Sequence, residues 1–332
     1  QLLHTSNLYH IPLQEQLADR LTALAGMDRV FFCNSGAEAN EAAIKIARLY
    51  AHKKDVAEPE IIVAHKSFHG RTLATLSATD NDKVRSGFEP LVQGFVHVPY
   101  NRADAIESTL KASGKVVAVL LEPVQGEGGI IVPERGYLRT VRKLCNDNGV
   151  LLILDEIQTG MCRTGRWFAF QHEEITPDVM TLAKALGNGV PIGACLARGE
   201  AAELVLPGKH GSTFGGNPLA SRVALAVLDV LEEQKLDQRA VHLGKTMLDG
   251  FHAGLKGVKG VLDVRGLGMM FGIELDRDCA ALVEMALSQH LLINVTAGNV
   301  VRILPPLIIS DAEAAQIVDL VCRLVNEFLA QQ

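Results

Sequence analysis

The sequence has few aromatic residues, no long apolar run and no excess of basic residues. Phe, Trp and Tyr together make up 5% of the 332 residues, and only one Trp occurs. No apolar run approaches the roughly 18 residues of a membrane-spanning helix, so a membrane protein is not expected. The 32 Lys and Arg residues are outnumbered by 38 Asp and Glu, for a formal net charge of -6. This balance argues against nucleic acid or an anionic membrane as the main partner.

Cysteine is also sparse, and its placement indicates reduced thiols. Six cysteines occur, none of them in a CxxC pair, and most lie inside apolar runs. This pattern favours the cytoplasm over a secreted, disulfide-linked framework. The chain opens on Gln1 without an initiator Met, a helix-start signal or a signal peptide, and we expect it to begin partway into a domain.

The periodic pattern that is present predicts an α/β protein of two domains, at residues 1–235 and 236–332. In the first, alternating strand and helix patterns are typical of a mostly parallel central sheet flanked by helices. Its expected helices are at about 13–24, 35–50, 137–146 and 217–233, and its strands at 30–33, 61–64, 116–124, 150–154 and 192–197. The smaller C-terminal domain is expected to be α+β, with strand patterns at 258–273 and 300–304, a helix near 278–289, and a last helix beginning with a Ser310–Glu313 capping box.

An acid and a lysine carry the most specific chemical signal. Asp155 follows the apolar run 151–154, and a buried strand of a parallel sheet delivers its last side chain to the edge where ligands bind. Lys184 follows apolar residues and precedes a Gly-Asn-Gly turn, so it also lies near an element end. An acid that pairs with a pyridine nitrogen and a lysine that forms an imine are the minimal protein groups for pyridoxal phosphate.

Each of these two residues has a rival interpretation. Four apolar residues before Asp155-Glu156 also resemble the Walker B strand of an ATPase. Such an enzyme needs a GxxxxGK[ST] phosphate loop as well, and the candidate for it is Gly244-Lys245-Thr246. Arg239 stands where the first glycine of that loop belongs, so the ATPase interpretation fails. Lys184 could be a surface lysine with an extended aliphatic stem. Its small and apolar neighbours instead lead us to expect partial burial, which lowers a lysine pKa and favours attack on a carbonyl.

Four further segments combine polar groups with glycine. Ser35-Gly36-Ala37 at a helix start could bind phosphate or simply cap the helix. The segment 67–72 places Phe68 and Arg71 around a glycine, either as a ring-stacking and carboxylate-binding site or as a plain turn. Segment 122–129 is a polar, glycine-rich loop at the end of a strand, which favours a ligand site over a spacer. Segment 210–217 is a glycine-rich loop with two hydroxyl groups, which could bind phosphate.

Two other features concern charged residues and histidines. Arg302 in an apolar strand needs a carboxylate, supplied by an internal salt bridge or by a substrate. His65 and His69 are four residues apart but lack an acidic partner and a helix signal, so no metal site is expected.

The full set of motifs resembles a known family, class III (ornithine-type) pyridoxal-phosphate aminotransferases, over nearly the whole chain. Seven segments follow one another in that family's order: SGAEANEAAIKIAR, SFHGRT, EPVQGEGG, LDEIQTG, AKALGNG, HGSTFGGNP and VRILPPL. The resemblance implies the type I aminotransferase fold and a homodimer with active sites at the subunit interface. The family carries a further N-terminal segment that this sequence lacks, which puts contacts with the substrate in doubt.

The resemblance also implies roles for individual residues around pyridoxal 5'-phosphate. Lys184 would hold the cofactor and move the substrate proton, while Asp155 would keep the pyridine nitrogen protonated. Gln158 would approach the phenolic oxygen of the ring, and Phe68 would stack on the ring. The residues that would bind its phosphate are Ser35, Gly36, Ala37 and, from the neighbouring subunit, Thr213.

For the substrates, the resemblance implies two arginines and a glutamate that switches between them. Arg71 and Arg302 would bind the two carboxylates of 2-oxoglutarate or glutamate, and Ser212 would lie near the substrate. Glu127 would pair with Arg302 when the diamine-type substrate is bound. The motifs are most similar to the branch of the family that moves the δ-amino group of N-acetylornithine to 2-oxoglutarate. Ornithine, succinylornithine, succinyldiaminopimelate and 4-aminobutyrate remain alternative donors, and a non-catalytic relative that keeps the fold is a second alternative.

Overall fold

The computed structural model describes residues 2–331, which cluster into two compact units. The first unit contains the chain up to Pro123 together with Pro133–Met161 and Trp167–Glu233. The second contains Val124–Val132, Cys162–Arg166 and the chain from Gln234 onward. The chain therefore contributes two short excursions to the second unit before its main part begins. The division into domains made from the sequence, near residue 235, stays a prediction.

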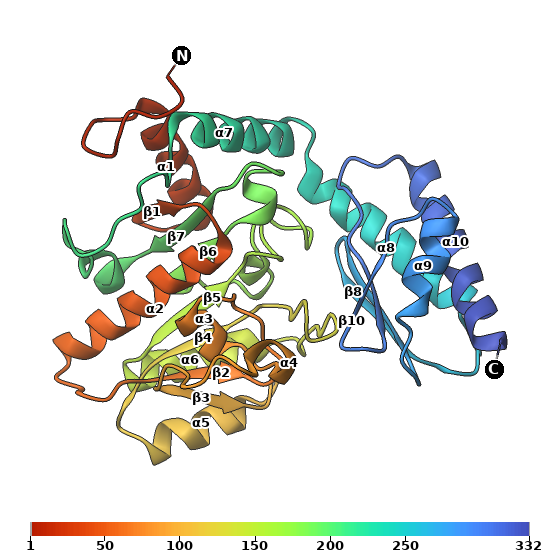
Figure 1. Ribbon diagram of the computed structural model, residues 1–332, viewed down its shortest axis with the longest axis horizontal. Coiled ribbons are helices and arrows are strands. Elements are labelled where there is room, and N and C mark those ends of the chain that lie inside the picture. The colour runs from red at the N-terminus through yellow and green to blue at the C-terminus, as the bar shows by residue number, and fades with distance from the viewer. Residues whose placement is uncertain (1, 332) are drawn as a thin grey trace. The chain divides into compact units, whose positions relative to one another are not determined.

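The first unit is built on a seven-stranded sheet in the order β1-β7-β6-β5-β4-β2-β3 (Figure 1). Five neighbouring strands of the sheet, β6, β5, β4, β2 and β3, are parallel to one another. Strand β7 runs antiparallel to both of its neighbours, β6 and β1. The mostly parallel sheet predicted from the sequence is thus confirmed. The strands are β1 (Arg29–Cys33), β2 (Glu60–Ala64), β3 (Phe95–Val98), β4 (Val116–Leu121), β5 (Leu151–Asp155), β6 (Val179–Leu182) and β7 (Gly193–Ala197).

Helices pack against this sheet, and α2 (Gly36–Lys53) is the one that matters most for the site. Its apolar stripe packs across β4, β5, β6 and β7. Ser35 caps it by accepting the N–H of Glu38 at 3.2 Å, while the carboxylate of Glu38 accepts the N–H of Asn34 rather than that of Ser35. The other helices of the unit are α1 (Pro12–Ala25), α3 (Leu73–Ala78), α4 (Asp82–Arg85), α5 (Ala103–Ala112), α6 (Tyr137–Asn148) and α7 (Pro218–Glu233).

The second unit is an antiparallel four-stranded sheet with three helices, as the α+β prediction requires. Its strand order is β10 (Asn294–Thr296), β11 (Val300–Ile303), β9 (Met270–Leu275) and β8 (Val261–Leu267). Helix α8 (Leu236–Gly254) packs against α10 (Asp311–Ala330), and α9 (Ala281–Ser288) also contacts α10. The capping box at the start of α10 is present, with Ser310 and Glu313 bonding each other's backbone N–H.

Two differences from the sequence-based elements have physical reasons. Strand β4 ends at Leu121 instead of continuing to 124, because Pro123 has no N–H to extend the ladder. Helix α8 was not expected, since three glycines interrupt its periodicity. One of them, Gly244, is required because a side chain there would collide with the backbone of Gly268.

Within residues 2–331, no helix is both long enough and apolar enough to cross a membrane.

Candidate active site

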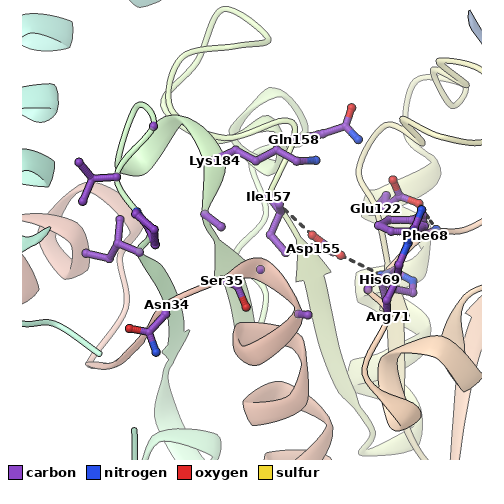
Figure 2. A pocket seen from close by; sticks show the side chains of 18 residues that line it. Asn34, Ser35, Phe68, His69, Arg71, Glu122, Asp155, Ile157, Gln158 and Lys184 are labelled. Carbon is purple, nitrogen blue, oxygen red and sulfur yellow. Dashed lines mark hydrogen bonds and ion pairs between the residues drawn. The ribbon is translucent and has the colours of Figure 1, made fainter. Parts of the chain in front are cut away.

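A cavity of about 470 Å³ lies in the first unit, at the carboxyl ends of its parallel strands (Figure 2). This is the volume range of small-molecule sites, at the sheet edge where α/β proteins bind ligands. Fourteen of its lining residues belong to the motifs singled out above: Ser35, Gly36, Ala37, Phe68, His69, Gly70, Arg71, Glu122, Asp155, Ile157, Gln158, Ala183, Lys184 and Gly189. The loops after β2, β4, β5 and β6 and the start of α2 thus converge on one space.

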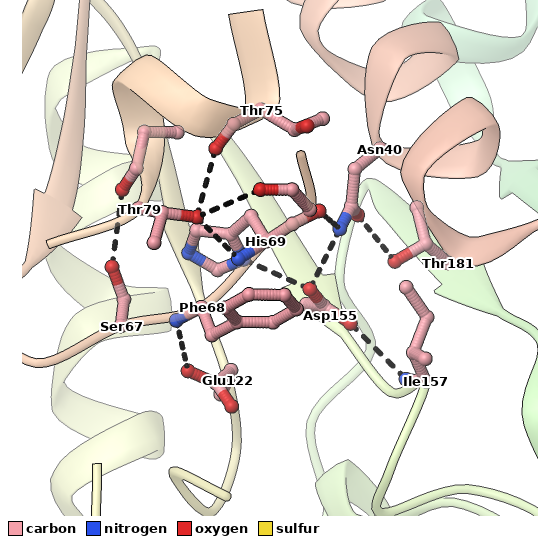
Figure 3. A network of polar contacts seen from close by, with 12 residues as sticks. Asn40, Ser67, Phe68, His69, Thr75, Thr79, Glu122, Asp155, Ile157 and Thr181 are labelled. Atoms are coloured by element: carbon pink, nitrogen blue, oxygen red, sulfur yellow. Dashed lines mark hydrogen bonds and ion pairs between the residues drawn. The ribbon is translucent and has the colours of Figure 1, made fainter. Parts of the chain in front are cut away.

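Asp155 is the buried acid of this cavity, with 4% of its surface exposed. Its Oδ2 accepts hydrogen bonds from Asn40 Nδ2 at 2.7 Å and from His69 Nδ1 at 2.8 Å, and its Oδ1 accepts the N–H of Ile157 at 3.1 Å (Figure 3). Three donors around one carboxyl group fix its orientation. Asp155 is therefore held in place on the wall of the cavity.

Lys184 lines the same cavity but is exposed, which corrects the expectation of partial burial. The reason is local: Ala183 is buried, and Lys184 then adopts a left-handed conformation with a φ of 44° at the start of a short 3-10 helix. This backbone conformation is uncommon for a residue with a side chain. It turns the lysine out of the sheet, and its side chain extends toward Gln158 (Figure 2).

The start of α2 provides a cradle for an anion. The first backbone N–H groups of a helix have no partner within the helix and attract negative charge, as a phosphate would supply. Two glycines keep this end accessible: a side chain on Gly36 would come within 2.7 Å of Ile157, and one on Gly193 would collide with the carbonyl oxygen of Ser35. Gly36 and Ala37 both line the cavity, so this end of the helix borders it.

Two polar atoms of the cavity lining are buried without a hydrogen-bond partner in residues 2–331. They are Gln158 Oε1 and His69 Nε2. A buried acceptor without a partner costs free energy unless a ligand satisfies it. Phe68 lies beside these groups, half-buried, with its N–H donating to Glu122 Oε1 at 3.0 Å. The cavity thus combines an aromatic side chain, unpaired polar atoms and the N-terminus of a helix. These groups fit a flat ring with polar substituents and a phosphate, as in pyridoxal phosphate.

The remaining predicted site residues of the first unit lie on exposed segments. Arg71 is exposed and lines the cavity. Ser212 does not line it, but its hydroxyl accepts hydrogen bonds from Asn34 Nδ2 and from the N–H of Gly215, both at 3.1 Å. Thr213 is exposed, and its carbonyl accepts the side-chain amide of Asn7 at 3.4 Å.

Arg302 and Glu127 belong to the second unit, where they form an ion pair. Arg302 Nη1 donates to Glu127 Oε1 at 2.6 Å, and Nη2 donates to Asn294 Oδ1 at 2.9 Å. The arginine side chain is 12% exposed, so it needs the compensating charge. The internal salt bridge considered from the sequence is therefore present. The loop of Glu127 is itself held by Thr296 and by Arg265, which donates to the carbonyl of Ile130 at 2.9 Å.

Sequence reasoning missed Asn40 and assigned His69 no role. Asn40 is fully buried in the middle of α2, and His69 is 2% exposed. The available signal for Asn40 was its position on the apolar stripe of the helix, where Ala43 and Ala47 lie on the same face. An amide among apolar residues on the buried face of a helix must have a polar partner.

Glu156, beside Asp155, makes the stability of the protein depend on pH. Burial raises the pKa of its carboxyl group to about 7, although the hydroxyl of Thr159 and the N–H groups of Ala169 and Phe170 donate to it. The native state then keeps a proton that the unfolded chain, with its ordinary value of 4.5, has lost. Stability should therefore fall as the pH rises from about 4.5 to about 7.

We expect the Glu156→Gln variant to lose this dependence. Its free energy of unfolding should be lower overall, because an NH₂ group replaces one of the two oxygens that accept these bonds, but flatter between pH 5 and pH 7. Urea unfolding at both pH values would measure the two slopes. A variant whose free energy falls as steeply as that of the wild type would show that another group is responsible.

Comparisons of sequence and of structure with known proteins point to one family. The model of the family described as aminotransferase class-III matches residues 1–325. An acetylornithine aminotransferase from Nitrosomonas europaea is 56% identical, over 99% of this chain and 84% of the relative. Among solved structures, an ornithine aminotransferase from Toxoplasma gondii has a TM-score of 0.96 at 36% identity, covering 100% of this chain and 80% of its own. An acetylornithine aminotransferase from Elizabethkingia anophelis has a TM-score of 0.88 at 37% identity, and the match covers 98% of this chain and 82% of that protein.

Proposed function

Because the chain belongs to the class-III aminotransferases, which depend on pyridoxal phosphate, we propose that it transfers the δ-amino group of N-acetylornithine to 2-oxoglutarate. The products are N-acetylglutamate 5-semialdehyde and glutamate, a reaction of arginine biosynthesis. The observation that carries the proposal is the placement of Asp155 and Lys184 on one cavity. The choice of donor is supported by curated acetylornithine aminotransferases that are 46–56% identical over nearly the whole chain.

In this proposal the residues of the first unit hold the cofactor. The N–H groups of Gly36 and Ala37, with Ser35, would bind its phosphate, and Phe68 and Gln158 would contact its ring and phenolic oxygen. Asp155 would pair with the ring nitrogen and keep it protonated. When bound, pyridoxal phosphate supplies an electron-withdrawing ring that acidifies the substrate carbon bearing the amine. The Nζ of Lys184 would hold the cofactor and, when free, would carry the proton from the substrate carbon to the cofactor.

Two arginines and one glutamate account for the alternation between substrates. Arg71 and Arg302 bind the two carboxylates of 2-oxoglutarate, which arginine grips in bidentate fashion. When the amino donor occupies the site, Arg302 has no substrate carboxylate to bind and pairs with Glu127, as in the 2.6 Å ion pair described above. Ser212 lies near the substrate. One site thus accepts two differently charged molecules in turn.

We expect the Glu127→Gln variant to separate the two half-reactions. Without the competing carboxylate, Arg302 binds the dicarboxylate more readily, so the KM for 2-oxoglutarate should fall about three- to tenfold. The KM for the amino donor should change little, because the ion pair is present whether or not the donor is bound. Glu58→Gln, which breaks an exposed pair with Lys115, is a matched control. A change of both KM values in the same direction would contradict the switch.

The proposal includes a homodimer in the cytoplasm. Large apolar side chains are exposed on and near the loop that carries Thr213, including Leu206 at 59% and Phe214 at 57%. A second copy covering them would bring Thr213 to the phosphate of the neighbouring subunit. The six cysteines are buried as free thiols, which suits a reducing compartment. Light scattering of the purified protein would show the dimer, and a monomer at micromolar concentration would contradict it.

The test of the function is a spectrum followed by a comparison of donors. Added pyridoxal phosphate should give the visible band of lysine-bound cofactor, and N-acetylornithine should bleach it. Steady-state rates with 2-oxoglutarate should then be higher for N-acetylornithine than for ornithine, succinylornithine, succinyldiaminopimelate or 4-aminobutyrate. A preference for one of the other amines would keep the reaction and replace the donor. A band that no amine bleaches would favour a relative that has lost activity.

A further inference from the structure

We propose that Asn40 is a positioning residue for the cofactor ring: it holds Asp155 oriented so that the carboxylate can bind the ring nitrogen. The proposal rests on the proposed role of Asp155 and goes beyond it. Asn40 lies on α2 rather than on the strand that carries the acid, and it acts through Asp155 (Figure 3).

The hydrogen bonds of Asn40 leave its side chain only one orientation. Its Oδ1 accepts the hydroxyl of Thr181 at 2.8 Å, so its Nδ2 must face the other way. Nδ2 donates one hydrogen to the carbonyl of His69 at 2.8 Å and the other to Asp155 Oδ2 at 2.7 Å. Both donors and one acceptor of the amide are therefore in use, and the group that faces Asp155 is always a donor.

Burial makes this donor decisive for the placement of Asp155. Asn40 and Thr181 are each 0% exposed, His69 is 2% exposed and Asp155 is 4% exposed. Side chains buried this deeply depend on protein donors, rather than on water, for their hydrogen bonds. Asn40 and His69 both donate to Oδ2, while among residues 2–331 the donor to Oδ1 is the N–H of Ile157 at 3.1 Å. A carboxylate oxygen has two lone pairs, so Oδ1 keeps accepting capacity for a ligand.

The position of Asn40 on α2 also ties Asp155 to the proposed phosphate cradle. Gly36 begins the helix and Asn40 lies four residues later, so the two share one face of the helix. One rigid element therefore fixes both the anion-binding end and the partner of the acid.

The test compares two ligands that differ only at the ring nitrogen. Pyridoxal phosphate and its 1-deaza analogue, in which a C–H replaces that nitrogen, are titrated into the full chain, and their dissociation constants are measured by fluorescence. The wild type should bind pyridoxal phosphate more tightly than the analogue. In Asn40→Leu, which keeps the size of the side chain without its donors, this preference should fall about tenfold.

Two further variants keep the outcome interpretable. Thr181→Val removes the hydroxyl that orients the amide and should lower the preference by a smaller factor, about threefold, with less risk to folding. Tyr50→Phe removes one buried hydrogen bond at the far end of the same helix, to the carbonyl of Gly149 at 2.9 Å, and should leave the preference unchanged.

The possible results separate the proposal from the function on which it rests. Equal weakening of both ligands in Asn40→Leu and Thr181→Val would mean that Asn40 is only structural and would overturn the proposal. An unchanged preference in both variants would overturn it as well. A wild type that binds both ligands equally would contradict the role of Asp155 itself, and one that binds neither would contradict the proposed function.

Discussion

Replacing Lys184 with alanine is expected to lower the turnover number by at least about 10⁴-fold, because the substitution removes both the covalent attachment and the proton carrier. The visible band of lysine-bound cofactor should disappear in the same variant. Stability should change by less than about 0.5 kcal/mol, since the side chain is exposed and alanine has the same Cβ in the left-handed conformation. The loss is therefore expected in chemistry and not in folding.

Absorbance spectra with added pyridoxal phosphate, single-turnover rates and thermal unfolding would test this expectation. Lys143→Ala is a suitable control, because Lys143 is an exposed lysine of α6, 74% accessible and paired only with Asp147. It should keep the band and the rate of the wild type. Turnover by Lys184→Ala within tenfold of the wild type would refute the role proposed for this lysine.

Replacing Asp155 with asparagine should lower turnover by on the order of 10²–10³-fold, as the loss of one preorganised electrostatic partner does in other active sites. The new amide is the same size but neutral, so the ring nitrogen loses the charge that keeps it protonated. Its orientation also suffers: if its nitrogen occupies the place of Oδ2, it meets the donors of Asn40 and His69. If its nitrogen occupies the place of Oδ1, it meets the N–H of Ile157. The first orientation leaves two donors without an acceptor, and the second leaves one.

The matched comparison for this prediction is Asp155→Glu, which keeps the charge but moves it by one methylene. We expect the glutamate variant to retain more activity than the asparagine variant if charge dominates. Stopped-flow measurement of the half-reaction with N-acetylornithine would report the proton-transfer step directly. Equal rates for the wild type and Asp155→Asn would rule out a catalytic role for the carboxylate.

Much of the cofactor cavity could be predicted from the sequence, because its parts lie at the ends of strongly patterned elements. The apolar run before Asp155 forms β5, and the Ser35 cap starts α2 where expected. The structure brings these segments to one cavity because carboxyl ends of parallel strands meet at one edge of a sheet. Their catalytic roles stay predictions, as do those of Arg71, Arg302 and Glu127.

What could not be predicted depends on contacts between distant parts of the chain or on backbone geometry. Asn40 acquires its meaning only when β5 brings Asp155 against α2, 115 residues later in the chain. The exposure of Lys184 follows from one left-handed backbone angle, which neighbouring residue types did not reveal. Helix α8 was missed because its glycines, such as Gly244, serve close packing with Gly268 and weaken the periodic signal at the same time.

The two excursions of the chain into the second unit have a consequence for biosynthesis. Val124–Val132 and Cys162–Arg166 leave the ribosome long before the residues beyond Gln234 that complete their unit. The second unit therefore cannot be complete until the chain beyond Gln234 has been synthesised, and no single cut in the chain separates the two units intact. Gene fusion or domain exchange at residue 234 would deprive the second unit of both segments and leave them attached to the first.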